Sequence, residues 1–402
     1  MNTRDDNSLQ ERGLVIIDWG RGGHSYMYLE KILQALSGSF DRLVAFSQYS
    51  AELAEFASAE WKGSKDMSFY PIQRASSRLG PLPRRIALRV RAWQMGRRVR
   101  KVLRTQPGAG MEYEVFFPCL AEWESIYYRY FCAGLGLRWS ALLLSFKGMR
   151  MADADMSILR NLNEKECVGA LTLDENRVDW LAERMPGKIT GFLADVSPTQ
   201  WDSSCPLADR ICEKAKGRKI VLLIGRLRKV KGVVNFAHTA LANSGEDLFF
   251  VMAGQLSPSG FDEEERVLVT ETFQNAENCY LHRDELKDEG EYNAVFRLAS
   301  IICIAYRNFP GSSNSLTKAA FFQIPVIVGS GYLLAERVHR YRIGEVVEKE
   351  DPEQLGDVIR RLANSGIEGE SPDWSGFQSH FSDEAFSQQL RGFMSKTGKE
   401  TQ

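Results

Sequence analysis

The sequence lacks any apolar run close to the ~20 residues that a membrane-spanning helix needs. Its seven cysteines form no CxxC pair and no zinc-type spacing, which argues against a disulfide scaffold and against a zinc site. The first residues, MNTRDDNSLQERG, contain no apolar core of the kind that a signal peptide needs. We therefore expect a cytoplasmic protein with reduced, buried thiols, and we expect neither a metal ion nor a bound cofactor.

The sequence also lacks the charge imbalance of a general polyanion binder. Its net charge is −1 at pH 7, and no nucleic-acid-binding motif occurs, so we expect no nucleic acid partner. The acidic pair Asp153 and Asp155 invites a metal-dependent interpretation, but it precedes SILRNLNEK and is better placed to cap that helix. We therefore reject the metal-dependent interpretation.

The sequence is rich in short apolar strands that alternate with helical patterns. The strands read as continuous apolar runs, which predicts parallel sheets covered on both faces. Two series follow one another: GLVIIDW, RLVAFS, EVFFPCL, SALLLSF and VGALTL, then KIVLLIGRL, DLFFVMAG, NCYLH, ASIICIAY and PVIVG. A chain of 402 residues also exceeds one ordinary hydrophobic core. We predict an α/β protein with two doubly wound, Rossmann-like domains.

The joint between the two series lies near ITGFLADVSPTQWDSSCPL, which contains proline and serine. We expect an N-terminal domain over residues 1–196 and a C-terminal domain over residues 197–377. The tail reads as an amphipathic helix, and we expect residues 378–402 to cross back and pack on the N-terminal domain. Ligands of open α/β sheets bind beyond the carboxyl ends of the strands, so we expect the site in a cleft across which the two domains face each other.

A glycine-rich loop, Gly20 to His24, follows the first strand. Its glycines, among them Gly22 and Gly23, permit positive φ angles and a close approach of a ligand to a helix N-terminus. The last glycine of a dinucleotide fingerprint is replaced by Ser25, and no acidic residue ends the second strand, so NAD binding is disfavoured. The functional interpretation of this loop is that it contacts a ligand in the cleft. The alternative is a tight turn that binds no ligand.

A second loop, GRLRKVKG, covers Gly225 to Gly232 and is basic where a helix begins. Cations are unfavourable at a helix N-terminus, by about 0.3–1 kcal/mol each when exposed. A bound diphosphate would convert this repulsion into paired attraction, with Arg226 acting as a fork and Lys231 as a point charge. A solvated basic turn without a ligand is the alternative.

The third loop follows a strand of the second series and is made of small polar residues. Its backbone N–H groups and potential caps form a ready anion site at Ser312, Ser313, Asn314 and Ser315. Simple helix capping is the alternative for this loop alone. Because three such loops occur at strand ends of two nucleotide-type domains, we expect the cleft to hold a phosphorylated ligand.

These residues carry a resemblance to the retaining glycosyltransferases of the GT-B fold, and the chain is similar to glycosyltransferase family 4. In that family a glycine-rich loop, matched here by Gly22 and Gly23, faces the acceptor and sugar, and we expect the adjacent His24 to be the histidine in the cleft. A "GRL…KG" turn, matched by Arg226 and Lys231, holds the donor diphosphate. The resemblance implies a glycosyltransferase whose catalytic groups include these two cations, with an acceptor-binding N-terminal domain and a donor-binding C-terminal domain.

The chain departs from the family at two places. The family's Glu-x7-Glu pair falls on Pro310 and Lys318, and in the family the second glutamate takes the donor ribose hydroxyls. A charged lysine only donates hydrogen bonds, so we expect Lys318 to contact a phosphate or an acidic sugar instead. The family's histidine after the fourth strand is also missing, and Glu122 or Glu124 in FFPCLAEWES could serve in its place, with Glu122 our candidate for the catalytic role. A solvated surface glutamate is the alternative.

A long stretch lacks acidic residues altogether. From Met67 to Met111 there are eleven Lys or Arg and no Asp or Glu, and apolar residues recur at helical spacing. This pattern predicts a basic amphipathic helix suited to an anionic membrane surface or a phosphate-bearing acceptor. An ordinary domain helix with solvated arginines is the alternative. The candidate surface residues are Arg84, Arg85, Arg97, Arg98, Arg100 and Lys101.

Together these features predict an enzyme that transfers a sugar from a nucleotide diphosphate-sugar to a glycan or lipid-linked acceptor. We expect retention of configuration, no metal requirement and a place in bacterial polysaccharide or envelope glycan synthesis, with the protein cytoplasmic or peripheral on the inner face of the membrane. The missing Glu pair and histidine leave a second hypothesis open, a catalytically inactive GT-B-like protein that binds a nucleotide as a scaffold or sensor.

Overall fold

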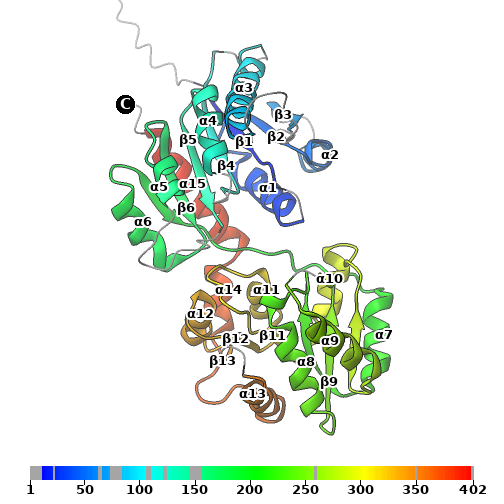
Figure 1. Cartoon of the computed structure of the whole chain (residues 1–402). Coiled ribbons are helices and arrows are strands. Elements are labelled where there is room, and N and C mark those ends of the chain that lie inside the picture. The colour runs from blue at the N-terminus through cyan, green and yellow to red at the C-terminus, as the bar shows by residue number, and fades with distance from the viewer. Residues whose placement is uncertain are drawn as a thin grey trace, which may run out of the picture. The chain divides into compact units, whose positions relative to one another are not determined.

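A computed structural model describes residues 11–20, 23–61, 66–72, 84–105, 110–120, 125–144, 156–257, 260–348 and 351–399. The chain forms two compact units (Figure 1). The N-terminal unit consists of Met1–Ala194 and Asp383–Gln402, and the C-terminal unit is Asp195–Ser382. The predicted division into an acceptor-binding and a donor-binding domain remains a prediction about what each unit binds.

The N-terminal unit is a seven-stranded sheet in which every pairing is parallel, with strand order β3-β2-β1-β4-β5-β6-β7. Its central strands are buried along most of their length, as their continuous apolar runs predict. The elements are β1 (Arg12–Ile17), α1 (Gly23–Leu36), β2 (Arg42–Ser47), α2 (Ser50–Glu60), β3 (Asp66–Pro71), α3 (Arg84–Thr105), β4 (Glu112–Phe117), α4 (Ser125–Leu135), β5 (Trp139–Leu143), α5 (Met156–Leu162), β6 (Cys167–Thr172), α6 (Val178–Arg184), β7 (Ile189–Phe192) and α15 (Asp383–Lys399).

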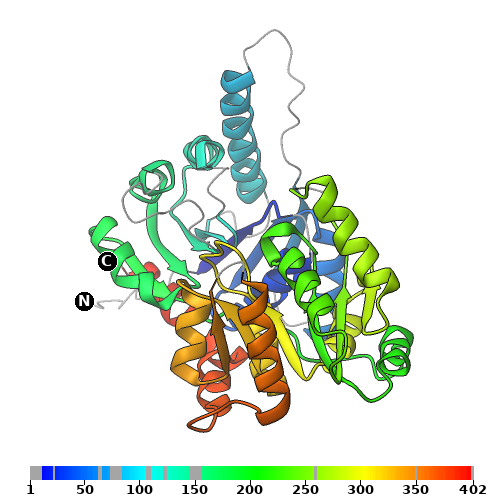
Figure 2. The same cartoon turned by 60° about the horizontal axis from the view of Figure 1, so that its bottom comes forward.

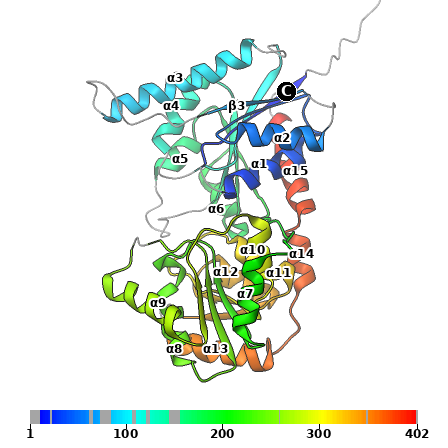
Figure 3. The ribbon, with the colours of Figure 1, turned by 90° about the vertical axis from the view of Figure 1, so that its right-hand side faces the viewer.

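Helices cover both faces of this sheet. Helices α3, α4 and α5 pack side by side on one face, while α1 packs against α2 and α15 on the other (Figure 3). Between the first group and the strands lies an aromatic cluster in which Trp19 contacts Phe117, Tyr128 and Phe131. The N-terminal unit therefore has its own hydrophobic core.

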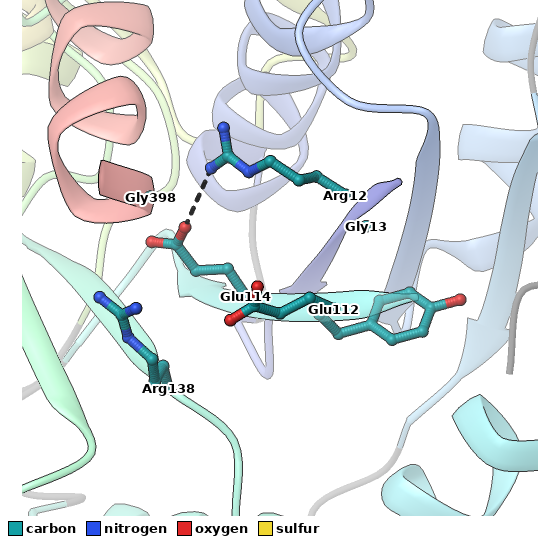
Figure 4. Close-up of a pocket in the computed structure, with 7 residues that line it drawn as sticks. Arg12, Gly13, Glu112, Glu114, Arg138 and Gly398 are labelled. Atoms are coloured by element: carbon teal, nitrogen blue, oxygen red, sulfur yellow. Dashed lines mark ion pairs between the residues drawn. The ribbon is translucent and has the colours of Figure 1, made fainter. Parts of the chain in front are cut away.

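Helix α15 belongs to the N-terminal unit and contacts it along its length, from Asp383, which pairs with Lys31 (2.6 Å), to its last turn. Arg138 Nη2 donates to the carbonyl oxygen of Thr397 (2.7 Å) and Arg12 Nη2 donates to that of Met394 (3.5 Å). Cations near the end of a helix stabilise its unpaired carbonyl groups. Figure 4 shows the two arginines on either side of Glu114, which pairs with Arg12 (3.7 Å) and whose pKa is raised by burial. We expected one helix over residues 378–402, whereas the structure ends α14 at His380 and begins α15 at Asp383.

The long basic helix α3 is close-packed on α4 through glycine. A Cβ on Gly96 would lie 2.2 Å from the carbonyl oxygen of Phe131, and one on Gly134 would lie 2.1 Å from that of Trp93. The two backbones therefore approach as closely as glycine allows. One end of α3 extends beyond the neighbouring helices of its unit (Figure 2).

The C-terminal unit is a six-stranded parallel sheet with the order β10-β9-β8-β11-β12-β13. Helices α8, α9 and α13 pack together on one face, and contacts join α7 to α10 and α14 to both α11 and α12. The elements are α7 (Pro206–Ala215), β8 (Lys219–Ile224), α8 (Val233–Ala242), β9 (Leu248–Ala253), α9 (Glu263–Asn275), β10 (Cys279–His282), α10 (Glu289–Phe296), β11 (Ile301–Ile304), α11 (Asn314–Phe322), β12 (Val326–Gly329), α12 (Leu333–Tyr341), β13 (Gly344–Val347), α13 (Pro352–Ser365) and α14 (Trp374–His380).

The prediction of two doubly wound α/β units with parallel sheets and a returning C-terminal helix is confirmed. Three strands were missed: β3, β7 and β13. They are half-buried edge strands, so they lack the continuous apolar run that marks a central strand. Strand β7 lies in the segment ITGF that the sequence analysis assigned to the joint.

Candidate functional site

Strand order in the C-terminal unit reverses between β8 and β11, and the loops that leave these two strands meet there. A Cβ on Gly232 would lie 2.7 Å from the carbonyl oxygen of Ala305. Arg307 N also donates to the carbonyl oxygen of Val230 (2.7 Å). Doubly wound sheets bind ligands beyond the carboxyl ends of the strands at such a reversal. The candidate site therefore lies where two of the loops singled out in the sequence meet, the loop after β8 and the loop after β11.

The turn after β8 is shaped by glycine. Gly225 has a φ of +100° and Gly254, at the end of the neighbouring strand β9, has a φ of +126°. A Cβ on Gly254 would lie 2.3 Å from the carbonyl oxygen of Gly225, so the two strand ends touch through backbone. Arg226 lies exposed next to this contact, and its Nε donates to Gln255 Oε1 (3.3 Å).

The two lysines of the basic turn have different partners. Lys229 Nζ forms an ion pair with Glu265 Oε1 (2.6 Å). Lys231 Nζ instead lies 5.0 Å from the ring centroid of Tyr306, and only 3.3 Å from where a Cβ on Gly225 would stand. Within the described part of the chain no carboxylate pairs with Lys231. This turn therefore presents one neutralised lysine and one whose charge no acidic group offsets.

The N-terminus of α11 lies in the loop that follows β11. Its cap residue, Ser313, has extended backbone angles and makes no side-chain hydrogen bond to the first turn. Arg337 Nη1 donates to Ser312 Oγ (2.5 Å), and the hydroxyl groups of Ser315 and Tyr292 lie 3.3 Å apart. Two of the serines are thus held by side chains from α12 and α10. The positive end of a helix dipole favours an anion at such an N-terminus.

Lys318 lies one turn further along α11 and is only 2% exposed. Its Nζ donates to Pro198 O (2.7 Å), Glu289 Oε2 (2.7 Å) and Asn293 Oδ1 (2.6 Å). An ammonium group has three N–H donors, and these partners use all of them. Burial lowers the pKa of Lys318, and the charge of Glu289 opposes that shift. This geometry argues against our expectation that Lys318 contacts the donor.

Two predicted site residues, Gly22 and Glu122, lie outside the described residues. Gly23 begins α1, and the side chain of His24 is likewise outside the description, as are those of Arg84 and Arg85. In the C-terminal unit the structure brings Lys231 and Ser315 to one end of the sheet, joined through Tyr292 and Gly225. Among the described residues no group of three or more His, Cys, Asp or Glu side chains has the arrangement of a metal site.

Sequence reasoning missed three side chains of this region, Glu289, Tyr292 and Tyr306. Tyr306 follows the buried strand β11 by two residues, so its position at a strand end was an available signal. Glu289 and Tyr292 lie on α10, in a stretch without a motif. Burial raises the pKa of Tyr292 above its ordinary value, so its hydroxyl group stays protonated at neutral pH.

Residues 208–373 match the family model described as "Glycosyl transferases group 1". The matched residues lie entirely in the C-terminal unit. They include every residue described above around Lys231 and Lys318 except Pro198. No curated protein matches the sequence significantly. The family match supports the predicted enzyme class, a glycosyltransferase.

Solved structures resemble nearly the whole chain. HepE of Anabaena, solved with UDP and glucose, has a TM-score of 0.68 at 10% identity, with 96% of this chain and 99% of that chain covered. Sucrose-phosphate synthase of Thermosynechococcus elongatus has a TM-score of 0.66 at 14% identity, with 98% and 100% covered. A glycosyltransferase of Rickettsia africae has a TM-score of 0.65 at 13% identity, with 97% and 99% covered. These similarities confirm the predicted fold class, GT-B; the assignment to family 4 stays a prediction.

Proposed function

We propose that the protein transfers a sugar from a nucleotide diphosphate-sugar to a glycan or lipid-linked acceptor, with retention of configuration. The observation that carries this proposal is the unpaired Lys231 at the strand-order reversal, close to the uncapped N-terminus of α11. A cation and a helix N-terminus at one sheet end form a site for a diphosphate. The family match and the UDP complexes of HepE support a nucleotide-sugar donor.

The chemistry follows from the charge that develops on the leaving group. When the glycosidic bond breaks, negative charge accumulates on the diphosphate, and preorganised cations that face it lower the barrier. We assign this task to Lys231 and Arg226, assisted by the backbone N–H groups at Ser312 to Ser315. Because two side-chain cations supply this stabilisation, we expect transfer to proceed without a divalent metal ion.

The donor assignment is tested with purified full-length protein and a panel of UDP-, GDP-, ADP- and dTDP-sugars. Thermal shift identifies the nucleotide, and donor hydrolysis, with and without EDTA, identifies turnover. We expect one nucleotide class to bind and Arg226→Ala to lower turnover, whereas Lys229→Ala serves as the matched control because Lys229 is already paired with Glu265. The proposal fails if no nucleotide sugar binds or is hydrolysed.

We further propose that α3 places the protein on an anionic membrane surface, where a lipid-linked acceptor would be found. Ile86, Val90 and Trp93 are 47%, 41% and 39% exposed, and their spacing puts them on one side of the helix. The guanidinium of Arg97 lies 5.0 Å from the ring centroid of Trp93. An exposed apolar stripe with arginines around it is the pattern of an interfacial helix. No described helix is long and apolar enough to cross a membrane.

This surface is tested by sedimentation with phosphatidylcholine vesicles that either contain or lack phosphatidylglycerol. We expect salt-sensitive binding to the anionic vesicles, reduced both by Trp93→Ser and by the Arg97→Glu/Arg98→Glu pair. Val267→Ser is the matched control, because Val267 is a 41% exposed apolar residue on α9 of the other unit. Equal binding to neutral and anionic vesicles would contradict the proposal.

One observation favours a second candidate function, a catalytically inactive nucleotide-binding scaffold or sensor. Lys318, which the resemblance to family 4 puts at the position of that family's second glutamate, gives its three donors to protein groups. A scaffold would bind a nucleotide without turning over any donor across a broad acceptor screen. Retained binding in the absence of both hydrolysis and transfer therefore separates this candidate from the enzyme.

A further inference from the structure

This inference rests on the proposed diphosphate site and concerns how Lys231 is held there. The ammonium group of Lys231 lies 5.0 Å from the ring centroid of Tyr306. The ring quadrupole attracts a cation without neutralising it, because the ring carries no net charge. Lys229, two residues earlier, is held by the carboxylate of Glu265 at 2.6 Å. The same turn therefore holds its two lysines by two different means.

The ring of Tyr306 is fixed by its surroundings. Tyr306 is 5% exposed, and the ring of Phe309 meets it edge to face at 5.2 Å between centroids. Its backbone is also close-packed, since a Cβ on Gly329 would lie 2.9 Å from the carbonyl oxygen of Tyr306. A buried ring that packs against a second aromatic ring and stands on a close-packed backbone gives the cation a defined place.

The space around the ammonium group of Lys231 is also limited at Gly225. A Cβ on Gly225 would lie 3.3 Å from Lys231 Nζ and 3.7 Å from the hydroxyl oxygen of Tyr292. Tyr292 in turn contacts Ser315 near the start of α11. The ammonium group thus lies close both to the glycine that follows β8 and to the ring face of Tyr306, and Tyr292 connects this place to the start of α11.

We propose that Tyr306 is a positioning residue for Lys231, and that its ring face holds the ammonium group for the donor diphosphate while leaving its charge available. A carboxylate in the same place would pair with the lysine, and an incoming phosphate would have to displace it. An aromatic face restricts the long lysine side chain without that competition.

The role belongs to the ring and not to the hydroxyl group. The hydroxyl oxygen of Tyr306 is buried without a hydrogen-bond partner in the described structure. A buried polar group without a partner destabilises a fold, so Tyr306→Phe keeps the ring face and removes a cost. We expect Tyr306→Phe to match the wild type in ligand affinity and to be at least as stable.

The test replaces residue 306 in the full-length protein by phenylalanine and by phenylalanines with increasing ring fluorination. Fluorine withdraws electron density from the ring face with little change in shape, so packing is nearly constant across the series. Isothermal titration with inorganic pyrophosphate, and in parallel with UDP, measures the affinity. We expect the Kd to rise stepwise with fluorination, to about tenfold for the trifluorinated ring, which corresponds to about 1.4 kcal/mol.

The possible outcomes separate this inference from the proposed function. Affinity that is the same across the fluorinated series overturns the positioning role while the diphosphate site stands. A loss of affinity already complete in Tyr306→Phe also overturns it, because the hydroxyl group would then carry the effect. If the wild-type protein binds neither pyrophosphate nor any nucleotide diphosphate, the proposed function falls and the inference falls with it.

Discussion

Two regions of the C-terminal unit are each organised around a lysine, and they differ in what surrounds the ammonium group. At the strand-order reversal, Lys231 is partly buried, lies on the face of Tyr306 and has no acidic partner among the described residues. One turn into α11, Lys318 is 2% exposed and donates to Glu289, Asn293 and Pro198 O.

The difference shows that burial and the available partners decide whether a lysine binds a ligand or stabilises the fold. A buried ammonium group needs internal acceptors to offset its desolvation, and once it has them it has no donor left for a ligand. An ammonium group at a loop surface retains water and charge, and can exchange that water for a phosphate. Lys318 therefore ties α10, α11 and the segment around Pro198 together, whereas Lys231 is available for a ligand.

The largest expected effect comes from removing the unpaired lysine. Lys231→Met should lower kcat/KM for the donor by about 100-fold or more, because one charge-stabilising group at the transition state is worth ~3 kcal/mol. Its free energy of unfolding should change by no more than about 1 kcal/mol, since no ion pair is lost and the contact removed is the one with the Tyr306 ring. Steady-state donor hydrolysis and urea denaturation measure the two quantities.

Lys229→Met is the matched control for that variant, since it changes the same side chain two residues away. It removes a surface ion pair, worth about 0–1 kcal/mol, and should leave turnover unchanged. Equal losses of activity in the two variants would mean that the loop needs only its net positive charge. The comparison between Lys231 and its neighbour would then be wrong.

The second effect is on stability. Lys318→Ala should destabilise the protein by about 2–4 kcal/mol, because it leaves the buried amide oxygen of Asn293 without a donor and removes one of the two donors to the carbonyl oxygen of Pro198, the other being Asn293 Nδ2. Lys318→Glu should be worse, since it places a second carboxylate beside Glu289. Urea denaturation at neutral pH checks both. A loss of donor affinity at unchanged stability would instead restore our sequence-based expectation that Lys318 contacts the donor.

A smaller effect should appear as a pH dependence of stability. The pKa of Lys318 is lower in the folded protein than its ordinary value of 10.5, because of burial. The native state therefore binds fewer protons than the unfolded state between the lowered pKa and 10.5, and stability rises with pH across that window. The difference in unfolding free energy between wild type and Lys318→Met should shift in favour of wild type as the pH rises. A constant difference across the alkaline range would contradict this assignment.

The smallest effect expected is at the turn itself. Gly225 has a φ of +100°, and a Cβ there would approach Lys231 Nζ to 3.3 Å. Gly225→Ala should therefore weaken pyrophosphate binding several-fold by displacing the ammonium group, with a backbone cost of about 1 kcal/mol in stability. Gly217→Ala is the control, since Gly217 has a φ of +83° but no neighbouring atom within 4 Å. If the two variants bind pyrophosphate with equal affinity, Gly225 does not contribute to the site.

The fold could be predicted because its signals are local in the sequence. The central strands of both sheets are continuous apolar runs, and their alternation with helices leads to two doubly wound units. The basic loop with Lys231 could be found for the same reason, since it directly follows such a strand. The edge strands β7 and β13 could not be found, because they are short, half-buried and contain glycine.

The surroundings of the two lysines could not be predicted, because the partners come from distant segments. Lys318 meets Glu289 across 29 residues and Pro198 across 120 residues of sequence, without a motif at either. The apolar spacing of α3 could not decide which residues are buried. Ala92 and Val99 are buried, whereas Ile86, Val90 and Trp93 are exposed, since close packing through Gly96 and Gly134 decides which side faces α4.

The most direct test of the account is a crystal structure of the full-length protein grown with the nucleotide diphosphate that the binding screen selects. We predict a phosphate group within ion-pair distance of Lys231 Nζ and next to the first turn of α11. Lys318 Nζ should keep its contacts with Glu289, Asn293 and Pro198 O. A phosphate bound to Lys318 in place of Glu289, with Lys231 turned away, would contradict the account.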